Sequence, residues 1–280
     1  MSTVAAALGA TRGKLPASEA RLLLGHLLGR SAAWLLAHDD ALLAEDALLD
    51  FASLVARRVG GEPIAYLVGS REFYGREFRV SPAVLIPRPE TELLVELAVA
   101  RVGADGTGRI LDLGTGSGCI AVSLALALPH AELTGVDASA AALDVARGNG
   151  AALGARVRWV QGDWFAPLSG ERFDVIVANP PYVADDDPHL RRGDLRYEPG
   201  GALASGTDGL DAIRSIAAAA FRHLKPGGLL LVEHGKGQAE AVRRMLVVAG
   251  LGTVRSYTDL AGIERVVAGE ALEFPAESMT

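Results

Sequence analysis

The chain has 280 residues, half of them hydrophobic, so it can form one large domain or two smaller ones around a sizeable buried core. No apolar run approaches the ~20 residues that span a membrane, and no basic stretch precedes an apolar one at the N-terminus, so we expect neither a membrane span nor a secretory signal. The formal net charge of −7 argues against a tight binder of duplex DNA, because phosphate contacts usually require a basic face.

Residues 1–70 have the apolar periodicity of helices. Leu15–Glu19 resembles a helix start, and the leucines that follow it recur at helical spacing. A second apolar series, from Leu42 to Val59, continues this pattern and ends at Gly60. Because no catalytic constellation occurs here, the segment is interpreted as a small helical bundle packed on its own apolar stripes, which could also present one face to a macromolecular partner.

Residues 71–88 differ in character from the helical segment. They contain two short strand-like runs around a turn at Gly75, which predicts a β-hairpin linker. Two prolines separated by one residue make Ile86–Glu90 extended. We expect a helix from Glu90 to Arg101 to open the second domain, which would span residues 89–280.

From Gly108 onward, strand-like and helix-like runs alternate, which predicts an α/β fold with a doubly wound parallel sheet. The last two candidate strands are joined by a turn too short for a crossover helix, so they should pair antiparallel. The predicted strands are Arg109–Leu113, Glu132–Val136, Val157–Gln161, Phe173–Ala178, Gly228–Glu233, Thr253–Thr258 and Glu264–Val267. The predicted helices are Ile120–Leu128, Ala140–Leu153, Leu210–His223 and Gln238–Ala249.

A glycine-rich loop, Gly114–Gly118, follows the first of these strands and opens a helix. Its glycines let a ligand approach the backbone, and the helix N-terminus offers unpaired N–H groups. A dinucleotide fingerprint would place a third glycine at position 119, where the chain has Cys119, and Asp112 suits a cationic ligand such as a sulfonium better than a pyrophosphate. This favours a methyl-donor site over a nicotinamide or flavin site and over a purely structural turn. The candidate donor-binding residues here are Asp112, Gly114, Thr115, Gly116, Ser117 and Gly118.

Cys119 is the only cysteine in the chain, which excludes an internal disulfide and a thiolate metal cluster. These features fit a reducing, cytoplasmic setting, and we expect no metal site. Since the sequence shows no base near Cys119, we expect this residue to pack at the base of the helix rather than to act as a nucleophile.

Acidic residues end the next two strands. Asp137 is placed to accept hydrogen bonds from ribose hydroxyls, although an aspartate there could also cap the following helix. Asp163 could accept from an adenine amino group, and Trp164 could cover the ring; a core tryptophan beside a turn is the alternative.

The tetrapeptide Asn179-Pro180-Pro181-Tyr182 follows a buried-looking strand, at the sheet edge where the glycine loop also lies. Both prolines lack N–H donors and stiffen the segment, so its carbonyls and the Asn179 side-chain oxygen could accept both hydrogens of an NH₂ group. Tyr182 offers a ring face to a flat substrate. Such hydrogen bonds would pyramidalise a delocalised nitrogen and aim its lone pair at a donor methyl. A structural Pro-Pro turn is the alternative.

The pairing of Asp112–Gly118 with Asn179–Tyr182 resembles the class I amino-methyltransferases, which include DNA adenine and protein-glutamine enzymes. Further segments resemble the bacterial release factor glutamine methyltransferases, the HemK/PrmC family, over nearly the whole chain. They are Gly61–Gly69, Arg71–Tyr74, Leu85–Glu92, Glu198-Pro199, Gly206–Leu210, Val232–Gly235 and Gly262–Val266.

This resemblance implies a helical N-terminal domain that helps to dock the substrate, a hairpin linker and a Rossmann-like catalytic domain with a seven-stranded sheet. It implies S-adenosylmethionine as methyl donor, with S-adenosylhomocysteine as product, and the glutamine of the Gly-Gly-Gln loop of peptide chain release factors as acceptor. The Gly114–Gly118 loop, Asp137, Trp164 and Asn179 would contact the donor, and Asn179–Tyr182 would hold the glutamine amide, with Asn179, Pro180 and Tyr182 as catalytic residues.

Two other functions compete with this expectation. A nucleic-acid adenine methyltransferase would use the same tetrapeptide, but the acidic charge and the lack of an evident base-reading module disfavour it, and no direct nucleic-acid binding is required. A non-catalytic module that binds the methyl donor and docks partners is disfavoured by the intact Asn179.

Overall fold

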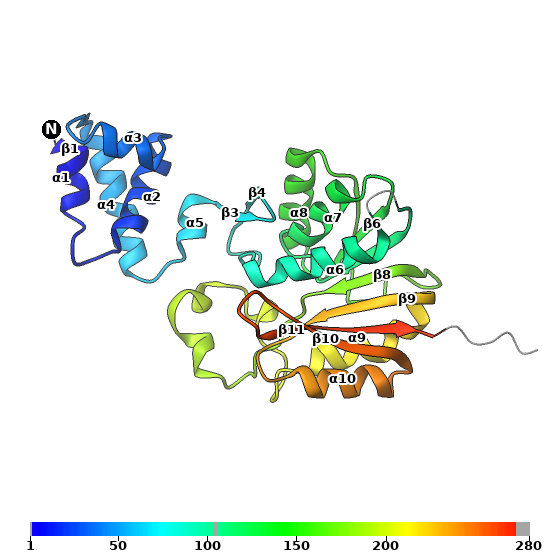
Figure 1. Cartoon of the computed structure of the whole chain (residues 1–280). Helices are drawn as coiled ribbons and strands as arrows, with labels where there is room; N and C mark the ends of the chain where they lie inside the picture. Colours follow the sequence, from blue (N-terminus) through cyan, green and yellow to red (C-terminus); the bar gives the residue numbers. More distant parts are fainter. Residues whose placement is uncertain (1, 104–105, 273–280) are drawn as a thin grey trace, which may run out of the picture. The chain divides into compact units, whose positions relative to one another are not determined.

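The computed structural model describes residues 2–103 and 106–272, which fall into two compact units (Figure 1). The first unit runs up to Ser70 and also includes Arg191–Tyr197. The second unit consists of Arg71–Leu190 and the chain from Glu198 onward. Each unit contains its own buried apolar side chains, with one cluster in the first and two in the second.

The first unit is helical, as the sequence predicts. Its helices are α1 (Val4–Gly9), α2 (Ala17–Leu28), α3 (Ala32–Ala37), α4 (Glu45–Val59) and α5 (Ile64–Val68). Helix α2 ends at Gly29 in the left-handed conformation, and α4 has acidic residues in its first turn and basic residues in its last, which complements the helix dipole. Leu23, Leu24 and Phe51 lie in the buried cluster that holds these helices together.

One expectation for this unit was wrong. Leu42 and Leu43 do not continue a helix: they form a two-residue strand, β2, that pairs antiparallel with β1 (Ser2–Thr3). The N–H groups of Val4 and Ala5 donate to the carbonyls of Ala41 and Asp39 at 3.0 and 2.8 Å. The first turn of α1 therefore uses this segment to satisfy its free N–H groups, which keeps the segment extended.

The predicted hairpin consists of β3 (Ser70–Phe73) and β4 (Arg76–Arg79). Tyr74 and Gly75 form its two-residue turn, and both have positive φ, as the primed turns that suit hairpins require. The Asn149 side chain brackets the end of β4: its Oδ1 accepts from the N–H of Arg79 at 2.8 Å, and its Nδ2 donates to the carbonyl of Arg79 at 3.0 Å.

The second unit contains the predicted seven-stranded sheet, in the order β10-β11-β9-β8-β5-β6-β7. Strands β5 to β9 pair parallel with one another, β11 pairs antiparallel with β9, and β10 and β11 pair antiparallel, as predicted. The strands are β5 (Arg109–Leu113), β6 (Glu132–Asp137), β7 (Val157–Gln161), β8 (Phe173–Ala178), β9 (Leu224–Glu233), β10 (Leu251–Thr258) and β11 (Glu264–Ala271). The helices of this unit are α6 (Glu92–Val102), α7 (Cys119–Ala127), α8 (Ala140–Leu153), α9 (Asp211–His223) and α10 (Ala239–Val248), with short 3₁₀ turns η1 (Pro89–Thr91) and η4 (Gly200–Ala202). The 3₁₀ turn η2 (Pro188–Arg191) ends at the first residue of the segment that belongs to the first unit, and η3 (Gly193–Tyr197) lies within that segment.

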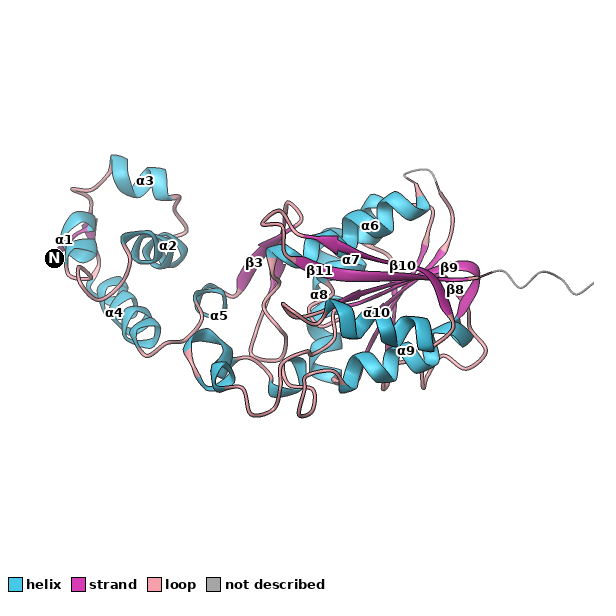
Figure 2. Cartoon of the chain, turned by 60° about the horizontal axis from the view of Figure 1, so that its bottom comes forward, coloured by secondary structure: helices cyan, strands magenta, loops and turns pink. Residues whose placement is uncertain are grey.

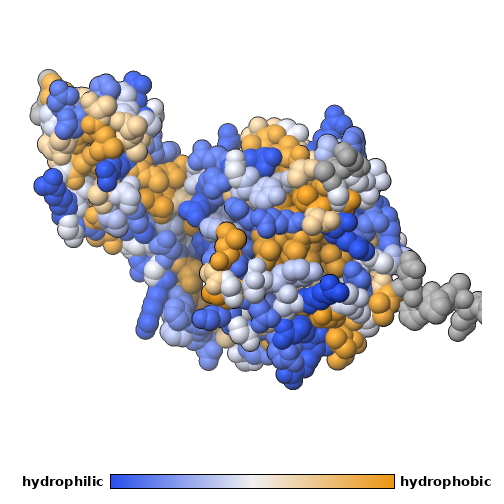
Figure 3. Space-filling view, in the orientation of Figure 1, coloured by the Kyte–Doolittle hydropathy of each residue, from blue (hydrophilic) through white to orange (hydrophobic). Residues whose placement is uncertain are grey.

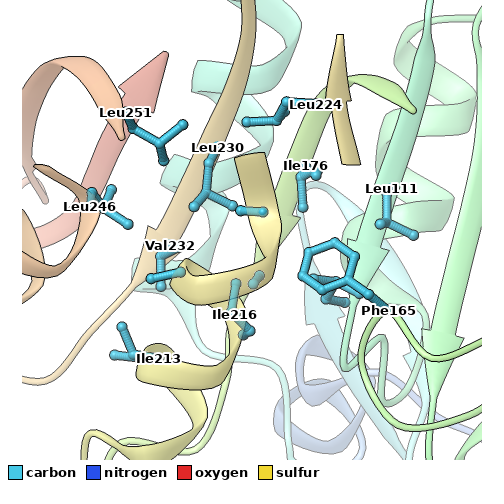
Figure 4. Close-up of a cluster of buried hydrophobic side chains, with 14 of the residues drawn as sticks. Leu111, Phe165, Ile176, Ile213, Ile216, Leu224, Leu230, Val232, Leu246 and Leu251 are labelled. Atoms are coloured by element: carbon cyan, nitrogen blue, oxygen red, sulfur yellow. The ribbon is translucent and has the colours of Figure 1, made fainter. Parts of the chain in front are cut away.

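Helices cover both faces of this sheet (Figure 2). Alternate residues of the central strands point to opposite faces: Ile110, Val175 and Val177 pack with α6 and α7. Leu111, Ile176 and Leu230 pack with Ile213 and Ile216 of α9 (Figure 4). Because both faces of the sheet are buried, the sequences of these strands are continuous apolar runs.

The strand order reverses at β5, which lies between β8 and β6. In doubly wound sheets, ligands bind at such a switch point, outside the carboxyl ends of the strands. Among the described residues, none of the helices has both the length and the apolar composition needed to cross a bilayer.

Candidate functional site

A cavity of about 310 Å³ opens at the carboxyl ends of β5, β6, β7 and β8. This volume is at the lower end of the range of small-molecule sites. The predicted site residues that line it are Gly114, Thr115, Gly116, Ser117, Asp137, Asp163, Trp164, Asn179 and Pro181. Four other predicted residues, Asp112, Gly118, Pro180 and Tyr182, do not line it.

The glycine loop is held against the end of β6 by backbone hydrogen bonds. The N–H groups of Gly114 and Thr115 both donate to the carbonyl of Val136 at 2.9 Å. Gly114 and Gly116 have φ of 71° and 55°, which L side chains rarely adopt. A Cβ on Gly114 would also lie 3.4 Å from the Trp164 ring, so the loop and this ring pack closely.

Gly118 serves a different purpose from the other loop glycines. A Cβ on this residue would lie 3.1 Å from both Ala146 of α8 and the Trp159 ring. Glycine here lets the start of α7 pack closely against α8 and β7, the role of the last glycine in many nucleotide-binding loops.

Asp112 lies beneath the loop. Its Oδ2 accepts from the Thr115 hydroxyl at 2.6 Å and from the N–H of Ala121 at 3.2 Å. Its Oδ1 is buried without a hydrogen-bond partner among the described residues, and burial raises the pKa of this carboxyl to about 7. The geometry makes Asp112 a support of the loop and of the start of α7.

Asp137 joins the end of β6 to the glycine loop. Its Oδ2 accepts from the N–H of Gly116 at 2.8 Å, and its Oδ1 accepts from the N–H of Ser139 at 2.9 Å. An ionised carboxylate has about four acceptor positions, so this residue can accept two further hydrogen bonds from a ligand. The N-cap of α8 is Ser139 and not Asp137: the Ser139 hydroxyl accepts from the N–H of Ala142 at 3.2 Å.

Trp164 has a φ of 43°, one of three described non-glycine residues with positive φ. Strained backbone of this kind persists where the surroundings impose it, often at ligand sites. The ring lines the cavity beside Gly114 and also packs on the core. Asp163, which is exposed, precedes it in the cavity wall.

Asn179 directs its two amide atoms to different surroundings. Its Nδ2 donates to the Thr91 hydroxyl oxygen at 3.1 Å. Its Oδ1 is buried and has no hydrogen-bond partner among the residues that the structure describes. A buried acceptor without a partner in a cavity wall is suited to a ligand N–H.

Tyr182 holds the tetrapeptide in place. Its hydroxyl donates to Glu233 Oε1 at 3.3 Å, and its carbonyl accepts from Gln238 Nε2 at 3.0 Å. The ring packs on the core, and burial raises the pKa of the phenol. The N–H of the next residue, Val183, donates to the carbonyl of Leu203 at 2.9 Å, which fixes the chain beyond the tetrapeptide.

Two segments line the cavity that the sequence did not assign to the site. They are Ala83–Thr91, most of which was expected to be linker, and Pro199–Ala202. Arg88 and the fully buried carboxylate of Glu198 form an ion pair, and Glu198 also accepts from the N–H of Ile86 at 3.0 Å. This pair ties the two segments together. The sequence did contain one indication that this segment belongs to the site, which is an arginine between two prolines. So rigid a segment can hold a charged side chain in one position.

Cys119 also lines the cavity, but burial raises the pKa of its thiol to about 12. The thiol therefore stays neutral at physiological pH, which supports the expectation that it is not a nucleophile. Within residues 2–103 and 106–272, no group of three or more histidine, cysteine, aspartate or glutamate side chains could hold a metal.

Comparisons with known proteins agree with this geometry. The family model for the PrmC N-terminal domain matches residues 2–69, and that for the methyltransferase small domain matches residues 89–192. The release factor glutamine methyltransferase of Bordetella pertussis (strain Tohama I) is 55% identical over 256 residues, covering 91% of this chain and 95% of that protein.

Two further relatives extend this comparison. The enzyme of the same name from Xylella fastidiosa (strain Temecula1) is 48% identical and covers 98% of this chain and 100% of its own length. Among solved structures, a methyltransferase from Pyrococcus furiosus is 17% identical and has a TM-score of 0.56, covering 79% of this chain and all of that one, which supports the fold. The chain therefore belongs to the release factor glutamine methyltransferase family.

Proposed function

We propose that the chain transfers the methyl group of S-adenosylmethionine to the side-chain amide nitrogen of the glutamine in the Gly-Gly-Gln motif of peptide chain release factors, supporting translation termination in the cytoplasm. The observation that carries this proposal is one cavity that contains the glycine loop and Asp137 together with Asn179 and Pro181. The names of the close relatives support the choice of substrate.

The cavity residues fit S-adenosylmethionine. Gly116 leaves room for a ligand, since a Cβ there would meet nothing closer than 3.9 Å. Asp137 has spare acceptor positions for ribose hydroxyls, Trp164 offers a ring face, and Asp163 offers a carboxylate. When bound, the donor supplies an electrophilic methyl group on a sulfonium.

The unpartnered Asn179 Oδ1 supports an amide or amine acceptor. This oxygen and the backbone carbonyls of the proline segment accept the two hydrogens of the glutamine NH₂ group. Hydrogen bonds to both hydrogens favour a pyramidal nitrogen and aim its lone pair. No strong base is needed before transfer, because the nitrogen becomes acidic as it gains the methyl group and then releases its proton.

We assign residues 1–70 to substrate docking, 71–88 to a hairpin linker and 89–280 to catalysis. Leu22, Leu36 and Leu49 are large apolar side chains exposed on the first unit, where Figure 3 shows apolar surface among polar residues. Exposed apolar side chains on a small bundle support a role in contacting a protein. The catalytic role requires neither a metal nor direct binding of nucleic acid.

The test is methyl transfer from labelled S-adenosylmethionine to three acceptors. A native release factor should be labelled. A release factor with Gln→Ala in the Gly-Gly-Gln motif, and a mixture of DNA and RNA fragments, should not. Equal labelling of the Gln→Ala factor would overturn the site assignment, and labelling of nucleic acid alone would indicate an adenine methyltransferase.

A further inference from the structure

The ion pair between Arg88 and Glu198 presents only one of its members to the cavity. Arg88 lines the cavity, whereas Glu198, whose side chain is fully buried, does not. Both carboxylate oxygens of Glu198 have donors within the protein: Oε1 accepts from Nη2 of Arg88, and Oε2 accepts from the N–H of Ile86 at 3.0 Å. The carboxylate therefore holds the guanidinium and the backbone beside it without facing the cavity itself.

Arg88 can hold a ligand in addition to Glu198. The bond to Glu198 uses an N–H of Nη2, and a guanidinium carries further N–H groups in the same rigid plane. The Arg88 side chain is 32% exposed, so part of it is open to the cavity that it lines. A planar fork of donors of this kind suits a carboxylate, which accepts through two oxygens.

The charges around the cavity are unevenly placed. Among the described residues that line the cavity, Arg88 is the one with a positive charge. The acidic side chains in the lining are Asp137, at the end of β6, and Asp163, just after β7. Either aspartate would repel a negative group on a ligand. The vicinity of Arg88 is therefore the part of the cavity that suits an anion.

The methyl donor brings such an anion. S-adenosylmethionine has a single carboxylate, at the end of its methionine arm, whereas the amide of an acceptor glutamine is neutral. The sulfonium that carries the methyl group lies between this arm and the adenosine. A donor whose ribose is at Asp137 and whose methyl group faces Asn179 therefore has its methionine arm on the side of the cavity away from Asp137.

Arg88 lies on the Asn179 side of the cavity. The N–H of Thr91 donates to the carbonyl of Arg88 at 3.1 Å, and the Thr91 hydroxyl oxygen accepts from Asn179 Nδ2 at 3.1 Å. One short turn thus connects the arginine to the first residue of the tetrapeptide. The cation is close to where the methionine arm begins.

We propose that Arg88 binds the carboxylate of the methionine arm of S-adenosylmethionine, with Glu198 holding the guanidinium in position for this contact. This inference rests on the proposed donor site and not on the choice of methyl acceptor. Arg88 acts on the affinity for the donor, and it does not touch the methyl group. The chain should therefore distinguish S-adenosylmethionine from an analogue that lacks the carboxylate.

The experiment measures the Kd values of two ligands by calorimetry. They are S-adenosylmethionine and decarboxylated S-adenosylmethionine, in which a hydrogen replaces the carboxylate. The adenosine, the sulfonium and the amino group are common to both ligands, so the ratio of the two Kd values isolates the contribution of the carboxylate. Because no methyl acceptor is present, the result does not depend on a release factor.

The variants are chosen so that no buried charge is left alone. Arg88→Gln by itself would leave the Glu198 carboxylate without its cation, which can prevent folding. The double variants Arg88→Gln/Glu198→Gln and Arg88→Met/Glu198→Gln remove both charges and keep an acceptor for the N–H of Ile86. Glu198→Gln alone keeps the arginine. Arg79→Gln is the matched control, since Arg79 is an exposed arginine of β4 that does not line the cavity.

The native chain should bind S-adenosylmethionine roughly tenfold to a hundredfold more tightly than the decarboxylated ligand, as expected for hydrogen bonds between charged groups. Both double variants should lose most of this preference and should bind the decarboxylated ligand as the native chain does. Glu198→Gln should fall between them and the native chain, because the guanidinium keeps its charge but loses its support. Arg79→Gln should match the native chain.

Equal Kd values for the two ligands in the native chain would overturn the inference. Double variants that keep the native preference, or a Glu198→Gln variant that loses as much of it as they do, would also overturn it. A higher KM for a release factor with an unchanged donor preference would instead assign Arg88 to the methyl acceptor, against the inference. A native chain that binds neither ligand would overturn the proposed donor site together with this inference.

Discussion

The backbone N–H of Gly116 donates to Oδ2 of Asp137 at 2.8 Å. This hydrogen bond joins the middle of the glycine loop to the carboxylate at the end of the neighbouring strand, across 21 positions of sequence. One side chain thereby shapes the loop and also presents its remaining acceptor positions to the cavity. Removing the Asp137 carboxylate should therefore weaken donor binding in two ways, by loosening the loop and by removing acceptors for the ligand.

Asp137→Ala should weaken binding of S-adenosylmethionine by about 1.5–3 kcal/mol, the usual value of hydrogen bonds to a charged group, or roughly tenfold to a hundredfold in Kd. Calorimetric titration measures this change. Asp144→Ala is the control, because Asp144 is an exposed aspartate of α8 that pairs with the nearby Arg147 and does not line the cavity. Equal affinities of both variants would remove Asp137 from the donor site.

Gly114→Ala and Gly148→Ala should have opposite effects. Gly114 has a φ of 71° and faces the Trp164 ring, so an added Cβ should cost about 1–2 kcal/mol of stability and weaken donor binding. Gly148 lies within α8, where a Cβ would meet nothing within 4 Å, so alanine should stabilise the chain by about 0.5–1 kcal/mol. Urea unfolding of both variants tests this pair, and destabilisation by Gly148→Ala would contradict it.

Asn179→Ala should lower kcat by roughly a hundredfold to a thousandfold, as in other enzymes that lose one preorganised polar contact to the reacting group. Binding of S-adenosylmethionine should persist, since the loop and Asp137 remain. Single-turnover transfer to a release factor measures the rate, and calorimetry measures the binding. An unchanged transfer rate would favour a module that only binds the donor and its partners.

Asp112 should make stability depend on pH. Burial raises its pKa to about 7, whereas an unfolded aspartate titrates near about 3.9. Between these values the folded chain holds a proton that the unfolded chain has released, so this group lowers the free energy of unfolding as the pH rises, by at most about 1.4 kcal/mol per unit. Asp112→Asn removes the effect.

Urea unfolding of Asp112→Asn and of the native chain, in buffers across this pH window, measures the difference. The variant should gain stability relative to the native chain as the pH rises through the window and keep that gain above it. A difference between the two chains that stays constant with pH would show that Asp112 does not hold a raised pKa.

The sequence predicted the sheet well because its signals are local. Strands β5, β7 and β8 begin and end at the predicted residues, since each is a short run bounded by turn residues. The helix expected from Glu90 begins at Glu92, after a 3₁₀ turn at Pro89–Thr91 that follows the proline segment. The predicted antiparallel pair also forms, because a short turn allows no other connection.

The remaining features depend on contacts between distant residues. Arg88 and Glu198 are 110 positions apart, and nothing in either segment indicates that they pair beside the cavity. The hydrogen bond between Asn179 and Thr91 spans 88 positions. The sequence also predicted that Asp112 and Tyr182 contact the ligands, but neither side chain lines the cavity. Residue type does not show this, because a buried aspartate and a half-buried tyrosine can equally support the cavity from behind.

The most direct test of the proposed function is mass spectrometry of a release factor after incubation with the chain and S-adenosylmethionine. The peptide that contains the Gly-Gly-Gln motif should gain the mass of one methyl group, and fragmentation should place that group on the glutamine side-chain amide. A methyl group on another residue, or an unmodified peptide after full incubation with the native chain, would contradict the proposed function.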